Sequence, residues 1–376
     1  MDTLRRLLQS WYAKPAFPDP PVYVAPPTTQ EHLEYADLAI IDLAQATTLA
    51  GRKALAGQLV AAMRAQGFFY AVNHGYTADQ TNRMFSIADL TLDEVGEEEK
   101  LRYCARSGHT YEGYKPRKTW HIDGVGDQIE QYTVGQHVLA REHPTALRPY
   151  LPELDAFSRH NTFNILHPVL RLMALGLELP EETLVQQHSY DSPSESSVRF
   201  MKYYPYSEEE EKLKKNVWLK GHTDIGSVTV LWSQPVGGLQ ILSPDGKWRW
   251  VRHMENAVVI NAGDVMTFLC GGFYPATRHR VVRPPEDQLT RPRLGVFFFA
   301  LANDDVKLVP HQTQSPVLQR VGVQRLCEDG DAPTMEQWRK TRVMQYGSKQ
   351  VELVKSETEE GVEEEMVGNV KVKYFN

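Results

Sequence analysis

Residues 221–232 read GHTDIGSVTVLW, and this stretch decides both the fold and the kind of site that we expect. Its second half is an apolar, alternating run, which is typical of a β-strand with a buried face. His222 and Asp224 stand two positions apart at its start. Because side chains two apart in a strand point to the same face, both can reach one metal ion.

A histidine and a carboxylate two positions apart do not by themselves indicate a metal site. A histidine with a carboxylate two positions later occurs four times, at His32/Glu34, His121/Asp123, His222/Asp224 and His253/Glu255. The first pair follows a proline-rich arm, the second lies in a glycine-rich loop and the last lies in a turn. Only His222/Asp224 leads into an apolar strand, so we expect a metal there.

A third ligand has to come from elsewhere, and His279 in ATRHRVV is the best candidate. It follows Asp224 after 54 intervening residues, 225–278. Two imidazoles and one carboxylate on one face of an octahedron leave three positions open, the arrangement of non-haem Fe(II) oxygenases. Two other interpretations stay open. One is ordinary polar strand residues, and the other is a zinc hydrolase, since zinc also takes His and carboxylate ligands.

Arg293 opens the otherwise apolar run RLGVFFFA, where an unpaired guanidinium is costly. A guanidinium fork binds a carboxylate bidentately, so Arg293 can hold the far carboxylate of a dicarboxylic co-substrate. We interpret residues 283–292 as a turn that lets the strands of His279 and Arg293 lie antiparallel and side by side. Tyr204 in MKYYPYS can donate to the same carboxylate. The alternatives are that Arg293 pairs with a buried acid, or that Arg291 takes its role.

The rest of the chain predicts an α+β fold with a mainly β core. Short alternating runs separated by Gly and Pro dominate from about residue 199 and predict a sandwich or jelly roll. The expected strands are 37–43, 68–72, 199–204, 219–224, 227–232, 239–242, 248–252, 257–260, 266–269, 278–282 and 293–301. The expected helices are 52–66, 77–93, 152–176, 181–187 and 334–346. Residues 208–215 are interpreted as an exposed excursion, and the Glu-rich stretch 357–365 as a solvated flank.

Composition excludes several classes of protein. With 376 residues, 41% hydrophobic and 24% charged, the chain is globular rather than disordered or fibrous. Its longest apolar stretch, at residues 294–302, is far shorter than the roughly 20 residues of a membrane span. Three widely spaced cysteines and the lack of a secretory start favour a cytoplasmic location. The net charge of −7 argues against a nucleic-acid partner.

Together these residues resemble the 2-oxoglutarate/Fe(II)-dependent dioxygenases of the isopenicillin N synthase-like group, most of all its fungal tailoring members. The similarity runs from about residue 37 to about residue 302. Besides GHTDIGSVTVL, the matching segments are IIDL (40–43), GFFYAVNHG (67–75), EEEK (97–100), GYKPR (113–117), DQIEQY (127–132), KYYP (202–205), GGLQIL (237–242), NAGDVM (261–266) and GGFYPATRHRV (271–281). A later segment, PTMEQWRKTRVMQYG (333–347), also resembles fungal members.

The resemblance implies a distorted double-stranded β-helix, a relative of the jelly roll, with flanking N-terminal helices and a C-terminal helix. It divides the chain into a proline-rich arm (1–36), an N-terminal helical region (37–198), an Fe(II)/2-oxoglutarate core (199–310) and a C-terminal helix with an acidic tail (311–376). It implies His222, Asp224 and His279 as iron ligands and Arg293 and Tyr204 as 2-oxoglutarate contacts.

Three departures from the group stand out. Gly295 replaces the serine of the usual R-x-S, Lys202 replaces the usual asparagine before Tyr-Tyr-Pro, and the interval from His279 to Arg293 is longer than in many plant members.

The implied reaction uses Fe(II), 2-oxoglutarate and O2 to oxidise a C–H bond of a hydrophobic small molecule, in fungal specialised metabolism. The presence of Asp224 argues against halogenation, because related halogenases have a small residue there. Candidate substrate contacts are Tyr114, Lys115, Trp120, Tyr132 and Phe273, each of which can equally be a core residue. The rivals are a 2-oxoglutarate-independent oxidase of the same fold and a non-catalytic binding protein on this scaffold.

Overall fold

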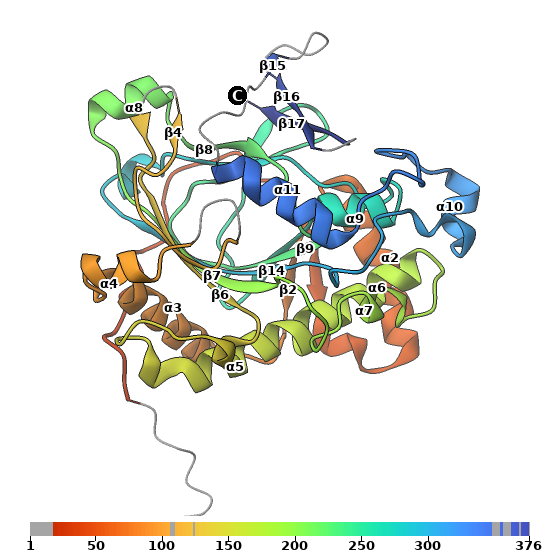
Figure 1. The fold of residues 1–376 in the computed structure, drawn as a ribbon, viewed down its shortest axis with the longest axis horizontal. Coiled ribbons are helices and arrows are strands. Elements are labelled where there is room, and N and C mark those ends of the chain that lie inside the picture. The colour runs from red at the N-terminus through yellow and green to blue at the C-terminus, as the bar shows by residue number, and fades with distance from the viewer. Residues whose placement is uncertain are drawn as a thin grey trace, which may run out of the picture.

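The computed structural model describes residues 18–105, 110–122, 125–347, 354–355, 362–367 and 370–375, with side chains for residues 18–105, 110–120, 125–344 and 370. Two large β-sheets dominate this part of the chain, and helices cover the outer face of one of them (Figure 1). This arrangement confirms the predicted jelly roll with flanking helices.

The larger sheet has eight strands in the order β1-β2-β12-β9-β14-β7-β6-β3. Its strands are β1 (Ile40–Asp42), β2 (Phe68–Val72), β3 (Gly113–Lys115), β6 (Ile129–Gly135), β7 (Ser197–Tyr203), β9 (Val228–Trp232), β12 (Val258–Ala262) and β14 (Arg293–Ala300). All neighbours in it are antiparallel except β1 and β2.

The smaller sheet has seven strands in the order β11-β10-β13-β8-β17-β16-β15. Its strands are β8 (Val217–His222), β10 (Leu239–Leu242), β11 (Trp248–Trp250), β13 (His279–Val282), β15 (Val354–Lys355), β16 (Val362–Val367) and β17 (Val370–Phe375). Strands β4 (His121–Ile122) and β5 (Val125–Gly126) pair antiparallel in a separate two-stranded sheet.

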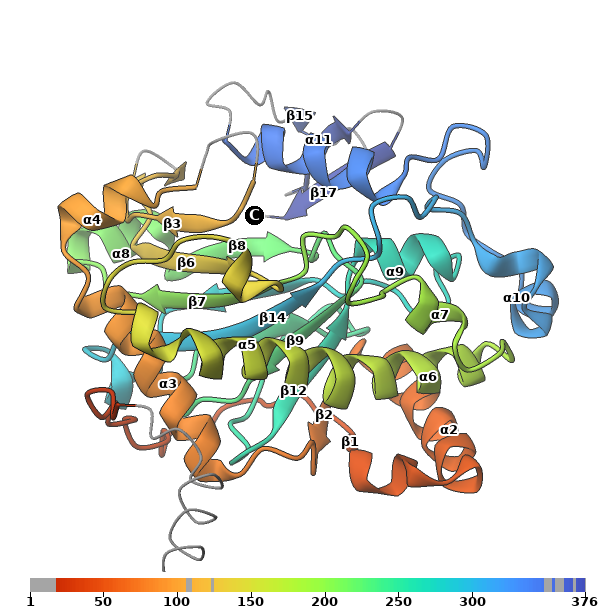
Figure 2. The same cartoon turned by 60° about the horizontal axis from the view of Figure 1, so that its bottom comes forward.

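Helices α2, α3, α5 and α6 lie along the outer face of the larger sheet, whereas α11 lies on the opposite side of the molecule (Figure 2). The α-helices are α2 (Leu49–Ala65), α3 (Ala78–Asp93), α4 (Glu97–Arg102), α5 (Leu151–His160), α6 (His167–Gly176), α7 (Thr183–Gln186), α8 (Glu208–Lys214), α9 (Asp264–Leu269), α10 (Pro316–Val321) and α11 (Met335–Gly347). A π-helical segment, η4 (Asn161–Leu166), joins α5 to α6; the 3-10 helices are η1 (Leu43–Thr47), η2 (Val138–Ala140), η3 (Arg148–Tyr150), η5 (Glu286–Gln288) and η6 (His311–Thr313). Every helix in the described residues is too short or too polar to span a bilayer.

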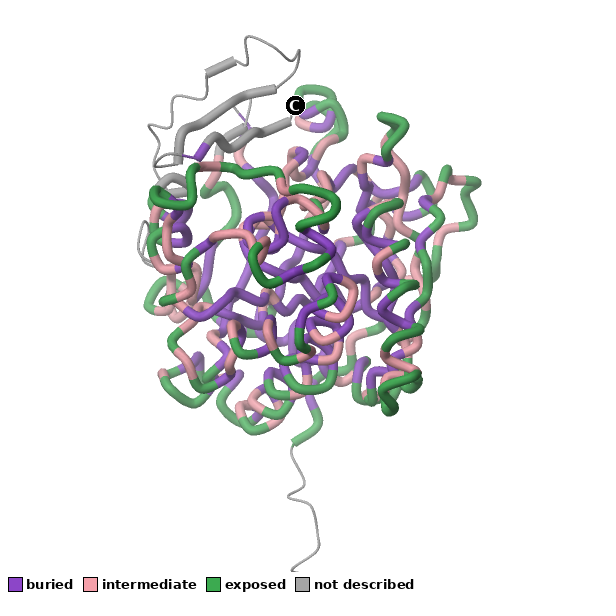
Figure 3. The backbone as a smooth tube through the Cα atoms, turned by 90° about the vertical axis from the view of Figure 1, so that its right-hand side faces the viewer, coloured by how far each residue is buried: buried purple, intermediate pink, exposed green. Residues whose placement is uncertain are grey.

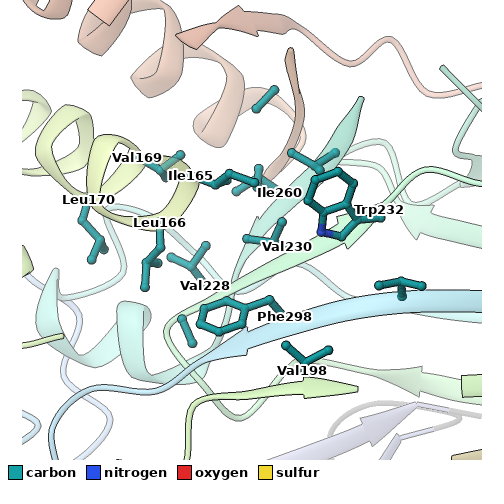
Figure 4. Close-up of a cluster of buried hydrophobic side chains, with 14 of the residues drawn as sticks. Ile165, Leu166, Val169, Leu170, Val198, Val228, Val230, Trp232, Ile260 and Phe298 are labelled. Atoms are coloured by element: carbon teal, nitrogen blue, oxygen red, sulfur yellow. The ribbon is translucent and has the colours of Figure 1, made fainter. Parts of the chain in front are cut away.

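Strand β14 shows how the alternation in the sequence creates two compartments. Its even-numbered residues, from Leu294 to Ala300, are buried in the core between the larger sheet and the helices. Figure 4 shows Phe298 of this set in a cluster with Val198 and Val230 of the neighbouring strands. Its odd-numbered residues Arg293, Phe297 and Phe299 line a cavity on the other face of the sheet. Buried residues gather in the centre of the molecule and exposed residues lie mostly at its periphery (Figure 3).

The predicted pairing of the strands that carry His279 and Arg293 is wrong. Strand β13 pairs with β8 and β10 in the smaller sheet, whereas β14 pairs with β7 and β9 in the larger sheet. Residues 283–292 are therefore a crossover between sheets rather than a hairpin turn. The two residues nevertheless line the same cavity, because the inner faces of both sheets enclose it.

Other local predictions also need correction. Residues 266–269 belong to α9 and not to a strand: Asp264 starts this helix after Gly263, and its N–H donates to the carbonyl of Asp224 at 2.7 Å. Residues 208–214 form α8, which a Ser207 capping box begins. The region 37–198 is not only helical, since it supplies β1, β2, β3 and β6 to the larger sheet. Part of the acidic tail, 362–367, is strand β16, and residues 357–361 lie outside the described residues.

Candidate active site

The three candidate ligands meet where β8 ends. His222 is the last residue of β8, His279 is the first of β13, and the two are cross-strand partners. Asp224 follows two positions after the strand. One ligand atom from each of the three lies within 4.8 Å of the other two, and no other such group of His, Cys, Asp or Glu occurs in the described residues. The sequence prediction that these three side chains converge is therefore met by the geometry.

Backbone carbonyls orient both imidazoles. Nδ1 of His222 lies 2.9 Å from the Lys220 carbonyl, and Nδ1 of His279 lies 3.1 Å from the Thr277 carbonyl. Since a carbonyl only accepts, each Nδ1 carries the hydrogen and each Nε2 keeps its lone pair. The Nε2 atoms face Oδ1 of Asp224 at 3.9 and 3.6 Å. Three donor atoms suited to a divalent metal thus point at one place.

Two neutral side chains hold the carboxylate of Asp224. Thr229 Oγ1 donates to Oδ2 at 2.6 Å, and Asn261 Nδ2 donates to the same oxygen at 2.9 Å. Burial alone raises the pKa of Asp224, but the two facing imidazoles and these two hydrogen bonds outweigh it, so the pKa is lowered. Burial lowers the pKa of His222 to about 4. An ionised carboxylate and a neutral imidazole are the forms that bind metal.

A cavity between the two sheets contains all three residues and also Arg293. It encloses about 1330 Å³ of empty space, part of it open to solvent. Arg293 is 3% exposed, and its Nε and Nη1 atoms lack any hydrogen-bond partner among the described residues. Burial lowers the pKa of Arg293, and the nearby Tyr203 and Tyr23 oppose that shift. A buried guanidinium of this kind fits a bound carboxylate, and Arg291, on the exposed crossover, does not reach the cavity.

The placement of Tyr204 corrects the sequence prediction. Its hydroxyl lies 3.2 Å from Glu130 Oε2, outside the cavity, whereas Tyr203 lines the cavity. Tyr203 is the direct cross-strand partner of Arg293, and the Arg293 Cζ lies 5.5 Å from its ring centre. Side chains opposite each other on antiparallel strands share a face, so the register selects the first tyrosine of the Tyr-Tyr pair.

We therefore expect Tyr203→Phe to raise KM for 2-oxoglutarate about threefold or more, the effect of losing one hydroxyl hydrogen bond. Tyr204→Phe serves as the matched control and should leave KM unchanged, because its hydroxyl faces Glu130. Succinate release at varied 2-oxoglutarate concentration measures both variants. If only Tyr204→Phe raises KM, then Tyr204 and not Tyr203 contacts 2-oxoglutarate.

The two departures Lys202 and Gly295 have structural explanations. Lys202 faces helix α3, where its Nζ contacts Asp89 at 2.8 Å and Asp93 at 2.6 Å. Lys202 therefore binds the helix and not the co-substrate. Gly295 faces the cavity side, and a Cβ atom there would come within 2.5 Å of the Phe297 ring. The ring of Phe297 thus occupies the space that a side chain at position 295 would need.

Of the five predicted substrate contacts, only Trp120 lines the cavity. Tyr114 is buried and donates to the Thr91 carbonyl at 2.6 Å, and Tyr132 is buried with its hydroxyl 2.8 Å from His143 Nδ1. Lys115 is buried in an ion pair with Asp127. Phe273 packs against Tyr274 and the helical core. These four residues hold the fold together, as the alternative interpretation of each allowed.

Sequence reasoning missed other residues of the cavity wall. Arg199 and Met201 line it from β7, and Arg339 and Arg342 line it from α11. The alternation in SVRFMKY could have predicted that Arg199 and Met201 share one face of β7, since residues two apart in a strand point the same way. Nothing local in the sequence shows that α11 reaches the cavity. Its Trp338 indole N–H donates to the Ile225 carbonyl at 3.0 Å, next to Asp224, so α11 forms part of the wall.

Comparison with known protein families agrees with this geometry. Residues 195–317 match the family model of the 2OG-Fe(II) oxygenase superfamily. Residues 38–153 match the model described as the non-haem dioxygenase in morphine synthesis N-terminal region. The chain belongs to the 2-oxoglutarate/Fe(II) oxygenase superfamily. It is a dioxygenase whose cofactor is Fe(II) and whose co-substrates are 2-oxoglutarate and O2, so the zinc hydrolase, the 2-oxoglutarate-independent oxidase and the non-catalytic binding protein are set aside.

Individual relatives of this dioxygenase include fungal enzymes. A 2-oxoglutarate-dependent dioxygenase of Gibberella zeae is 26% identical over 257 residues, which cover 66% of this chain and 75% of that protein. The 2-oxoglutarate-dependent dioxygenase frbH of Dothideomycetidae sp. is 28% identical over 295 residues, covering 74% and 86%. A full-length Neurospora crassa protein solved with alpha-KG has the same fold, with a TM-score of 0.71, 19% identity, and 84% and 99% of the two chains covered.

Proposed function

We propose that His222, Asp224 and His279 hold Fe(II), that Arg293 and Tyr203 hold 2-oxoglutarate, and that the enzyme oxidises a C–H bond of a hydrophobic small molecule. The observation that carries the proposal is the buried, unpartnered guanidinium edge of Arg293 in the same cavity as the triad. A buried charge without a partner is destabilising, and 2-oxoglutarate supplies a carboxylate at each end that can pair with it. The resemblance to fungal tailoring enzymes favours a place in specialised metabolism, and the three widely spaced cysteines favour a cytoplasmic location.

Each group of residues in the site would have its own role in the reaction. The iron and the co-substrate supply the oxidising power when bound. Thr229 and Asn261 keep Oδ1 of Asp224 aimed at the metal position, and the carbonyls of Lys220 and Thr277 keep both imidazoles in their metal-binding tautomer. Arg293 fixes the distal carboxylate and so orients the co-substrate. Helix α11 and the inner faces of the sheets limit the access of water to the reacting groups.

An anaerobic titration tests the proposal. Fe(II) added with 2-oxoglutarate should give the weak visible charge-transfer band of a chelated complex, and Fe(II) alone should not. In air, the same protein should convert 2-oxoglutarate to succinate, faster when a substrate is bound. Stoichiometric iron binding without the band and without succinate would contradict the proposal.

A further inference from the structure

We infer that Trp338 of α11 is a positioning residue of the metal site, which keeps the loop that carries Asp224 in the conformation that binds iron. This loop, called the ligand loop below, consists of residues 223–227 and joins β8 to β9. The inference rests on the proposed function, because it takes Asp224 as an iron ligand. The indole N–H of Trp338 donates to the carbonyl of Ile225 at 3.0 Å, and Ile225 directly follows Asp224 in the chain.

Donors from outside the ligand loop hold three of its consecutive carbonyls. The backbone N–H of Asp264, in α9, donates to the Asp224 carbonyl at 2.7 Å. The next N–H of α9, that of Val265, donates to the Gly226 carbonyl at 3.0 Å. The Ile225 carbonyl, between these two, accepts instead from the indole of α11. Loss of the indole N–H would therefore release the middle of the loop, next to the ligand.

The ring of Trp338 supports the ligand loop by a second, indirect route. Trp338 is buried, and its ring packs edge-to-face on Phe268 of α9, with ring centres 5.3 Å apart and planes 76° apart. Helix α9 is the same helix whose first residues donate to the ligand loop. Aromatic pairs in this geometry contribute to stability beyond the area that they bury. One side chain of α11 thus holds the loop directly through its N–H and indirectly through α9.

Strand β17 makes a similar contact beside a second candidate ligand. Phe375 of β17 pairs with Gly221 of β8, the residue before His222. Val370, which begins β17, is buried in the same apolar cluster as Trp338. Elements α11 and β17 therefore contact the chain next to both His222 and Asp224, although the two elements follow the strands of the jelly-roll core in sequence.

The role of Trp338 differs from that of its neighbours on α11. Arg339 and Arg342 line the cavity, so a change in either acts on whatever the cavity binds. Trp338 does not line the cavity. Its substitution should therefore weaken iron binding and leave KM for 2-oxoglutarate unchanged when iron is saturating. A residue that only supported the fold would lower the stability of the protein without this selectivity.

Trp338→Phe tests the inference, because it keeps an aromatic ring against Phe268 and removes the N–H. Anaerobic isothermal titration should show that the variant binds Fe(II) roughly threefold to tenfold more weakly, the effect of one hydrogen bond of ordinary strength. Trp232→Phe is the matched control. The Trp232 indole N–H also donates at 3.0 Å, but to Asn161 Oδ1 on the helix side of the larger sheet. This control should lower Tm and keep the iron affinity of wild type.

Phe268→Leu covers the case that Trp338→Phe does not fold. It keeps the indole donor and loosens the contact with α9, so its iron affinity should fall below that of Trp232→Phe. Equal iron affinities in Phe268→Leu and Trp232→Phe would then overturn the inference. If Trp338→Phe folds, an iron affinity equal to that of wild type or of Trp232→Phe would overturn it, and so would a rise in KM for 2-oxoglutarate without loss of iron affinity. If wild type binds no Fe(II), or binds it as tightly after Asp224→Ala, the proposed function itself fails.

Discussion

Replacing Asp224 with alanine should abolish turnover and remove the visible band of the Fe(II)–2-oxoglutarate complex. The change deletes one of three candidate ligands and leaves the two imidazoles of His222 and His279. Loss of a group that only supports a ligand typically costs 10- to 100-fold in metal affinity, so loss of the ligand itself should cost more than about a hundredfold. Isothermal titration with Fe(II) under anaerobic conditions measures the affinity directly.

Two further variants should lose less iron affinity than Asp224→Ala, or none. Thr229→Val removes the hydroxyl that donates to Oδ2 of Asp224 at 2.6 Å and should weaken iron binding by roughly tenfold while leaving the ligands in place. Glu255→Ala removes the exposed carboxylate of another His-x-Glu pair, and iron affinity should not change. Full activity in Asp224→Ala would overturn the ligand assignment, and equal losses in all three variants would indicate a folding defect.

The convergence of His222, Asp224 and His279 could be predicted from the sequence because each residue stands in a recognisable local pattern. His222 ends β8 and Asp224 follows it, shortly before the alternating apolar strand β9, and His279 begins β13. The prediction was weaker where it depended on which strands pair. The segment 283–292 has the composition of a hairpin turn, yet it connects two different sheets, and nothing local distinguishes the two cases.

The second limit on prediction from the sequence was strand register, which decides which side chains face each other across a sheet. Tyr203 and Tyr204 are chemically identical neighbours, and only the pairing of β7 with β14 shows which of them faces Arg293. The same alternation explains Lys202: it lies on the helix-facing side, where Asp89 and Asp93 of α3 compensate its charge. Contacts from distant segments, such as Arg339 and Arg342 of α11, need the assembled fold. The sequence therefore predicts the three candidate metal ligands better than the residues of the cavity wall around them.

Replacing Arg293 with methionine should raise KM for 2-oxoglutarate by roughly ten- to a hundredfold, because a charge-assisted hydrogen bond contributes about 1.5–3 kcal/mol. Iron affinity should change little, since Arg293 does not contact the triad. Arg293→Lys should recover only part of the loss, as an ammonium group lacks the planar fork of donors. Steady-state succinate release at varied 2-oxoglutarate gives KM for each variant. Arg291→Ala is the control on the exposed crossover and should behave as wild type.

Thermal unfolding separates co-substrate binding from structural support. If Arg293 serves a ligand and not the fold, the protein without 2-oxoglutarate should be as stable in Arg293→Met as in wild type, or more so, because the variant removes a buried charge without a described acidic partner. The rise in Tm that saturating 2-oxoglutarate gives wild type should then be lost, since ligand stabilisation follows affinity. A large fall in Tm of the unliganded variant would instead mean that Arg293 supports the fold, and the co-substrate would need a different anchor.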